Sequence, residues 1–192
     1  MKVHERAKVR AVPDDPLLEL LDEARASHAG EARGRERSLR RQAEEDASLT
    51  GALLDLAENG SAVTVRTVTG AVHHGVVVAV GADFCVVRAQ RGVDLILPLA
   101  AVSTVRPHPG ERHPPASGDR EPPSLVRLLD VLAMMAGERQ RVAVGTRDGE
   151  QVTGELRAVG SDVVTVALDA DLQALCYLSA SSMCEVAVLR SG

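Results

Sequence analysis

One pattern of glycines occurs twice in this chain. The stretches GAVHHGVVVAVGAD (residues 70–83) and GEQVTGELRAVGSD (residues 149–162) carry glycine at their first, sixth and twelfth places and end in aspartate. An offset of 79 residues aligns them, and it also aligns apolar residues on either side, namely Leu49, Leu53, Leu56, Val87, Leu99 and Ala101 with Leu128, Leu132, Met135, Val166, Leu178 and Ala180. A constant offset over this length indicates a duplicated domain.

Each copy opens with apolar residues at helical spacing. In the second copy Ser124 follows two prolines as the expected N-cap, and Gly137 ends the apolar stripe. In the first copy the stripe starts at Leu49 and stops before Asn59. These patterns predict a helix in front of each copy, with its leucines in the core.

A period-two pattern rich in valine follows each helix. Gly70 and Gly149 are expected in tight hairpin turns that need a positive φ. Gly75 and Gly154 lie inside the next strand, where glycine marks a sharp bend or a close approach of two backbones. The sequence therefore predicts a mainly β fold with helices, each copy being a helix and about five bent antiparallel strands in a small barrel.

Composition divides the rest of the chain. Residues 108–123 are rich in proline, charge and small side chains, which predicts a solvated linker between the copies at residues 48–107 and 124–192. Residues 1–47 lie outside the repeat and combine a basic arm with a helical extension. That extension starts at Asp15-Pro16 and carries four leucines, Leu17, Leu18, Leu20 and Leu21. This helix either packs on its own barrel or docks on a partner protein.

The order of helix, hairpin, glycine-bent strand and short final strands resembles the Sm-like fold, which includes Hfq-like RNA chaperones. The stretch TGAVHHG (residues 69–75) is similar to the start of the family's second strand, and AVSTVRP (residues 101–107) to its fifth. The resemblance covers residues 48–107 and 124–188 and implies two tandem Sm-like or SH3-like barrels. It also implies that the fourth strand of one barrel pairs with the fifth of the other, leaving one free edge at each end for self-association.

The residues with which Sm-like proteins bind RNA are largely replaced. Where the family has an aspartate that orders the RNA-binding loop, this chain has Gly81 and Gly160. Where the family often has a base-stacking ring, this chain has Asp83 and Asp162. Before the fifth strand, where Hfq-like members carry a Tyr-Lys-His run, Tyr177 is the one match. A carboxylate in place of a ring repels phosphate, so we expect the usual RNA site to be absent.

Two sets of residues remain as sites. Asp83 and Asp162 either accept backbone hydrogen bonds in their own turns or, in a ring of copies, line a pore with carboxylates. The second set forms either a modest site for an anion or RNA or a group of scattered surface residues. It comprises Arg66, Arg88, Arg91 and Tyr177.

Charge argues against a dedicated nucleic-acid binder. The chain has a formal charge of −5 and two aromatic residues, Phe84 and Tyr177. Residues 60–106 carry four arginines and two aspartates, whereas residues 138–192 carry five arginines and eight acids. The two copies therefore present net charges of opposite sign, which can attract one another.

Other classes of protein are disfavoured. No apolar run is long enough to span a bilayer, so a cytoplasmic protein without membrane contact is expected. His73 and His74 point to opposite faces of one strand and are interpreted as surface residues. The three cysteines lack metal-ligand spacing and are interpreted as buried free thiols. Because no catalytic motif stands out, we expect no enzyme activity, no cofactor and no bound metal.

The sequence thus favours a non-catalytic binding or assembly adaptor that has a protein partner. The alternative is an RNA-binding post-transcriptional regulator of the Hfq-like type.

Overall fold

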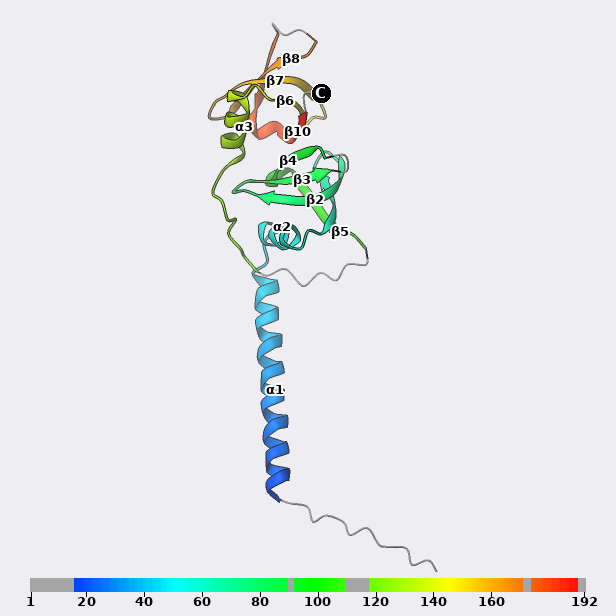
Figure 1. Cartoon of the computed structure of the whole chain (residues 1–192), viewed down its shortest axis with the longest axis vertical. Coiled ribbons are helices and arrows are strands. Elements are labelled where there is room, and N and C mark those ends of the chain that lie inside the picture. The colour runs from blue at the N-terminus through cyan, green and yellow to red at the C-terminus, as the bar shows by residue number, and fades with distance from the viewer. Residues whose placement is uncertain (1–15, 90–91, 110–117, 171–173, 190–192) are drawn as a thin grey trace, which may run out of the picture. The chain divides into compact units, whose positions relative to one another are not determined.

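The computed structural model describes residues 16–89, 92–109, 118–170 and 174–189 (Figure 1). Contacts divide the chain into two compact units, residues 1–42 and 43–192. Helix α1 (Pro16–Glu45) provides the described part of the first unit and is 30 residues long. It therefore continues through Gly30 and the charged segment beyond it, whereas the expected basic arm lies outside the described residues.

The second unit contains two helices and ten strands. In its first half the elements are α2 (Leu49–Glu58), β1 (Ala62–Thr67), β2 (Val72–Val80), β3 (Phe84–Ala89), β4 (Asp94–Pro98) and β5 (Val102–Pro107). In its second half they are α3 (Leu128–Gly137), β6 (Arg141–Thr146), β7 (Gln151–Val159), β8 (Val163–Leu168), β9 (Leu175–Ser179) and β10 (Met183–Leu189). The prediction of a mainly β fold with a helix in front of each copy is confirmed.

The ten strands form one antiparallel sheet in the order β5-β1-β2-β3-β4-β10-β6-β7-β8-β9. The first five strands of this order come from the first half and the last five from the second, in the same internal sequence. The two halves meet where β4 pairs with β10. The fourth strand of one copy thus pairs with the fifth strand of the other, as the resemblance implies.

Glycine shapes both halves at corresponding places. Gly70 and Gly149 have φ of 88° and 91°. The hairpin turns require these angles, which residues with a side chain rarely adopt. A Cβ on Gly75 would lie 2.2 Å from the carbonyl oxygen of Arg88, and one on Gly154 would lie 2.0 Å from that of Ala167. The close backbone approach predicted inside these strands is confirmed.

Two apolar cores lie in the second unit, and each has contributions from both halves. The first-half core is built on Leu53 of α2 and partly buries Ala187 of β10 against it. The second-half core is built on Leu132 of α3 and includes Phe84 and Ile96 of the first half. Burial of apolar surface therefore holds the two halves together as well as each half by itself.

The constant offset of the repeat fails after β3. β3 and β8 differ by 79 positions, but β4 and β9 differ by 81, because the connection before β9 is two residues longer. Strand pairing agrees, since Val105 lies opposite Val65 as Val186 lies opposite Val144. The alignment of Leu99 and Ala101 with Leu178 and Ala180 was wrong. Tyr177 therefore corresponds to Ile96, and Leu178 to Leu97.

The start of α3 also differs from the prediction. Ser124 is not the N-cap, because the helix begins at Leu128 and its N-cap residue is Arg127. The Ser124 hydroxyl instead accepts a hydrogen bond from the N–H of Val126 at 3.3 Å.

The end of the linker packs on α2. Arg120 donates hydrogen bonds to Asp55 at 2.8 Å and to Glu58 at 2.5 Å, and Gly118 is buried. A Cβ on Gly51 would lie 2.4 Å from the carbonyl oxygen of Gly118, so the absence of a side chain there permits this contact. The hydrogen bond from Arg120 lowers the pKa of Glu58.

Candidate binding interface

The two halves of the second unit meet at an interface that we call the internal junction. Its strands are β4 and β10, which pair with Ile96 opposite Val186 and Leu95 opposite Ala187. In Figure 1 this contact lies between the first-half and second-half strands, where the ribbons of β4 and β10 run side by side. Ile96 is 3% exposed and belongs to the second-half core.

A hydrogen bond to a helix end reinforces the internal junction. Asp83, in the turn between β2 and β3, accepts a hydrogen bond from the N–H of Leu128 at 2.7 Å. Leu128 is the first residue of α3, and the first N–H groups of a helix have no partner within it. The N–H of Ala82 also donates to the carbonyl of Val126 at 3.0 Å. The first half therefore caps the helix of the second half.

Asp83 was predicted as a turn residue or as part of a pore. Its backbone joins the turn to the end of β4, because its carbonyl accepts a hydrogen bond from Leu99 N–H at 2.8 Å. Its carboxylate, however, serves a helix 45 residues further along the chain. Arg127 lies 3.7 Å from the other carboxylate oxygen. The sequence could not reveal this role, since the local pattern fits an ordinary turn.

His73 and Glu185 form an ion pair across the junction when the histidine is protonated. His73 Nε2 of β2 lies 2.6 Å from Glu185 Oε2 of β10, and both side chains are largely buried. The interpretation of His73 as a surface residue was wrong, whereas His74 is exposed and lies 2.9 Å from the hydroxyl of Thr64. Val152 of the second half corresponds to His73, and Thr104 of the first half corresponds to Glu185. The repeat therefore does not carry this pair twice.

The sheet ends in two strands, β5 and β9, that have no second neighbour among the described residues. Tyr177 of β9 is 70% exposed, although its counterpart Ile96 is covered. Leu49, the counterpart of Leu128 at the start of α2, is 42% exposed, whereas Leu128 is 5% exposed. Asp162, the counterpart of Asp83, is also exposed. Each end of the sheet thus presents one side of an interface like the internal junction.

The residues predicted to bind an anion or RNA are not brought together. Arg66 of β1 is exposed, and its guanidinium contacts the carbonyl of Gly70 at 3.4 Å. Arg88 of β3 makes two hydrogen bonds to Asp94, at 2.8 and 3.2 Å, and these raise its pKa. Tyr177 lies in the other half, on the last strand of the sheet. Arg91 lies outside the described residues.

A hollow of about 440 Å³ that no sequence pattern predicted lies beside Arg88. His74, Arg88 and His108 line it together with residues of β1 and β2. The second half has no such residues, since Thr153 and Ala167 correspond to His74 and Arg88. Histidines in separate segments give no recognisable spacing, so the sequence carried no signal for this hollow.

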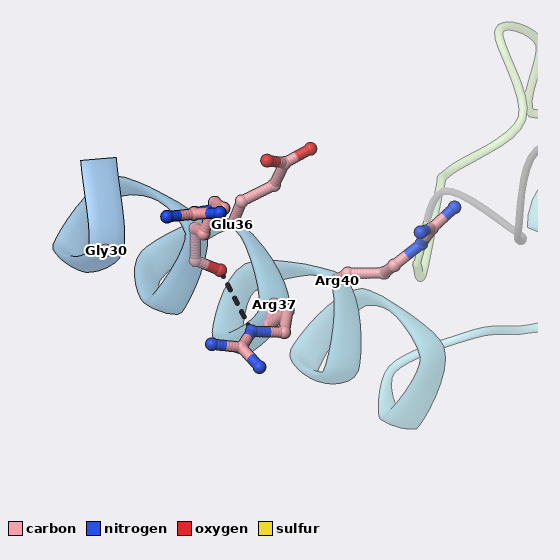
Figure 2. A pocket seen from close by; sticks show the side chains of 5 residues that line it. Gly30, Glu36, Arg37 and Arg40 are labelled. Atoms are coloured by element: carbon pink, nitrogen blue, oxygen red, sulfur yellow. Dashed lines mark hydrogen bonds between the residues drawn. The ribbon is translucent and has the colours of Figure 1, made fainter. Parts of the chain in front are cut away.

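The surface of α1 is polar and charged. Leu20 and Leu21 are 64% and 45% exposed, and Leu17 and Leu18 lie in the same helix, with side chains outside the described set. A second hollow, of about 490 Å³, lies on the surface of this helix. Figure 2 shows that Glu36, Arg37 and Arg40 point in different directions there. Arg37 donates to the carbonyl of Arg33 at 3.2 Å. Divergent side chains on one helix do not converge on a ligand.

The described residues contain no group of three or more His, Cys, Asp or Glu side chains placed to hold a metal ion. Cys85 and Cys184 are buried and Cys176 is partly exposed, and all three are free thiols. Burial raises the pKa of the Cys85 thiol to about 12, which makes it a poor nucleophile. None of the described helices has the length and apolar character needed to cross a membrane.

Comparison of the chain with protein-family models, curated protein sequences and solved structures found no match.

Proposed function

We propose that this protein is a non-catalytic assembly adaptor built from two Sm-like barrels, whose sheet edges join it to other protein chains. The identical strand order of the two halves supports this assignment, as does the crowded glycine in the long second strand of each. The stretch AVSTVRP, which resembles the fifth Sm-like strand, coincides with β5 and the turn before it.

The internal junction is the observation on which the proposal rests. It joins two halves through paired edge strands, a helix cap and shared apolar cores. An edge strand presents unpaired N–H and C=O groups that pair readily with another strand. β5 and β9 are such edges at the two ends of the described sheet. A protein with the same edge-joining design at both ends is suited to connect chains.

Several observations favour a protein partner over RNA. Arg88 is already paired with Asp94, and Arg66 and Tyr177 lie in different halves. Asp83 and Asp162 replace the ring on which Sm-like proteins stack a base, and Asp83 is used as a helix cap. The exposed leucines of α1, Leu20 and Leu21, offer a second place at which a partner protein can bind.

RNA binding remains the alternative function because of the hollow beside Arg88. His74 and His108 are exposed there, and protonated histidines together with arginine attract phosphate. Such a site would bind RNA weakly and lose it as the salt concentration rises.

The experiment is to purify the full chain from its own cells, with and without nuclease, and to measure bound nucleic acid and the mass of the intact complexes. We expect protein complexes without nucleic acid that survive moderate salt. The variant Tyr177→Glu, which places a charge on the β9 edge, should lose them, and Arg66→Glu should keep them as a matched surface control. RNA that stays bound in moderate salt and is lost in the variant Arg88→Glu would establish the alternative.

A further inference from the structure

We propose that the hollow beside Arg88 binds the phosphate group of a small organic molecule. Its donors are the guanidinium of Arg88, the ring Nε2 atoms of His74 and His108, and the hydroxyl of Thr64. The site uses neither end strand of the sheet, so it goes beyond the assembly function and does not depend on it. An RNA chain in the same hollow is one outcome of the test.

The pairing of the strands places these side chains on one face of the sheet. Thr64 of β1 lies opposite His74 of β2. Two residues before Thr64, Ala62 lies opposite Val76 of β2, which in turn lies opposite Arg88 of β3. Opposite residues share a face, and so do residues two apart in one strand. His74 and Arg88 therefore project on the same side of the sheet, in neighbouring rows.

His108 reaches this face from beyond β5. Its N–H donates to the carbonyl of Ala62 at 2.8 Å, which continues the pairing of β5 with β1 past Pro107. The alternate residues of β1, Val63 and Val65, are buried in the first-half core. The face that carries the basic side chains is therefore the outward one, where a ligand can reach it.

The hollow has the size of a pocket for a small molecule. Its volume is about 440 Å³, which lies within the usual range of ligand pockets. The small side chains of Ala62 and Ala89 leave space between the basic groups, and Val63 and Val76 complete the lining. A phosphate on a short carbon chain can therefore place its charge among the donors and its carbon atoms on the apolar lining.

Arg88 keeps donors for an anion although it is paired with Asp94. Its Nε donates to Asp94 at 2.8 Å and its Nη2 at 3.2 Å. A guanidinium carries further N–H groups, those on Nη1 among them, which this pair leaves for another acceptor. The pair fixes the orientation of the side chain and raises the pKa of Arg88, so the arginine stays charged. A fixed guanidinium fork suits the oxygens of a phosphate.

Each histidine of the hollow has one ring nitrogen beside an oxygen. His74 Nδ1 lies 2.9 Å from the hydroxyl of Thr64. His108 Nδ1 lies 3.2 Å from the carbonyl of Pro109, and it carries the hydrogen of this bond because a carbonyl only accepts. These contacts leave the Nε2 atom of each ring for a ligand. A protonated histidine donates from both ring nitrogens, so each Nε2–H can then bind an anion.

The other charged side chains of this face favour an anion over a cation. Arg106 of β5 lies opposite Thr64, and Arg66 follows two residues later in β1. Asp94 of β4 lies opposite Arg88 and is matched by that arginine. The surface around the hollow is therefore positive, which attracts phosphate and repels a metal ion.

The second half provides an arginine in the same kind of pair but without the histidines. Arg141 of β6 pairs with Asp169, and its side chain is 53% exposed against 54% for Arg88. Thr153 stands at the place of His74, and Leu189 at that of His108. Arg141→Gln is therefore the matched control for Arg88→Gln.

The experiment follows the backbone amide and histidine ring signals of the full chain by NMR, as inorganic phosphate or glycerol phosphate is added. Both probes should produce saturable shifts at Thr64, His74, Arg88 and His108. Arg88→Gln should weaken binding roughly tenfold or more, the effect of losing a hydrogen bond between charged groups. Arg141→Gln should bind as the wild type does.

A second variant keeps the test valid if Arg88→Gln alters the fold. His108 is exposed and follows the last residue of β5, so His108→Asn should fold normally and still weaken binding of both probes. Circular dichroism of each variant measures its fold. Binding of both probes to a folded His108→Asn variant as tight as to the wild type would remove His108 from the site and contradict the proposal.

Sulfate tests the part played by the histidines. A phosphate monoester gains a proton at about pH 6, whereas sulfate keeps both negative charges throughout the range in which histidines titrate. Sulfate binding should strengthen as the pH falls from 8 to 5.5, because protonation adds Nε2–H donors. The double variant His74→Asn with His108→Asn should lose this dependence, and a flat profile of the wild type would overturn the assignment of these donors.

Other results would overturn the inference as a whole. Absence of saturable shifts with both probes at millimolar concentration would show that the hollow binds no phosphate. Equal losses in Arg88→Gln and Arg141→Gln would show a diffuse attraction by surface charge. An oligoribonucleotide without a terminal phosphate that binds more tightly than glycerol phosphate would assign the hollow to RNA. Protein complexes that are lost in Tyr177→Glu would support the assembly function whichever of these results is found.

Discussion

At Gly154 a single methyl group does not fit. A Cβ there would lie 2.0 Å from the carbonyl oxygen of Ala167 and 2.8 Å from its carbonyl carbon. Both are backbone atoms of the neighbouring strand, so neither can move as a flexible side chain would. The same crowding at Gly75 shows that both halves depend on the absence of a side chain in the long bent strand.

The variant Gly154→Ala should therefore lower the free energy of unfolding by at least about 1–3 kcal/mol, the usual cost of overpacking. Urea denaturation followed by circular dichroism measures this loss. Gly137→Ala is the matched control, since a Cβ on that helical glycine would meet nothing within 4 Å. Equal stability of the two variants would contradict the account of the bent strand.

The free energy of unfolding should fall at alkaline pH because of the buried thiol of Cys85. Burial raises its pKa from 9.0 to about 12, so the unfolded chain loses this proton at lower pH than the folded chain does. The free energy of unfolding keeps its full value below pH 9, where the thiol is protonated in both states. It falls as pH rises from 9 towards 12, by at most about 1.4 kcal/mol per pH unit.

Unfolding free energies of the wild type and of Cys85→Ala, measured from pH 8 to pH 10.5, test this coupling. Above pH 9 the wild type should lose stability more steeply than the variant. Both proteins contain Cys184, whose pKa burial also raises, so its contribution cancels in the comparison. Parallel pH profiles would show that Cys85 is not the cause.

Among the elements, α3 shows most clearly what local sequence can and cannot predict. Its apolar stripe and its end at Gly137 follow from helical spacing. Its start does not, because the acceptor for its first N–H is Asp83, far away in the chain. Ser124 looks like a cap in the sequence, and only the fold shows that another residue takes this role.

The variant Asp83→Ala should destabilise the second unit by about 1 kcal/mol, since it removes a helix-capping carboxylate. Asp162→Ala is the matched control, because it removes the same residue type at the corresponding turn. At concentrations low enough to keep the chain monomeric, urea denaturation should show a loss for Asp83→Ala and none for Asp162→Ala. Equal losses would show that both aspartates act only in their own turns.

For the whole molecule, the repeat predicted the same elements in both halves, and the resemblance to Sm-like proteins implied the pairing between the two halves. The alternation of valines and the turn glycines follow directly from sequence. The longer connection before β9 was missed because leucine and alanine recur so often that a gapless alignment still matches apolar residues. The pair of His73 and Glu185 was also out of reach, since no local pattern links residues 112 positions apart.

Of the candidate site, the sequence identified Asp83, Asp162 and Tyr177 but gave them different roles. Asp83 is a helix cap across the internal junction, and Tyr177 corresponds to a strand residue of that junction. The structural role of each of these residues depends on which strands become neighbours in the sheet. Pairing of this kind is set by the packing of the whole second unit, which short sequence patterns do not record.

The covalent linker makes the internal junction independent of dilution. Residues 108–123 tether the two halves, so each meets the other at a high effective concentration however little protein a cell contains. A contact between separate chains has no such tether and follows the amount of protein present. Synthesis and degradation would thus control any contact between chains, while the two halves of each chain stay joined.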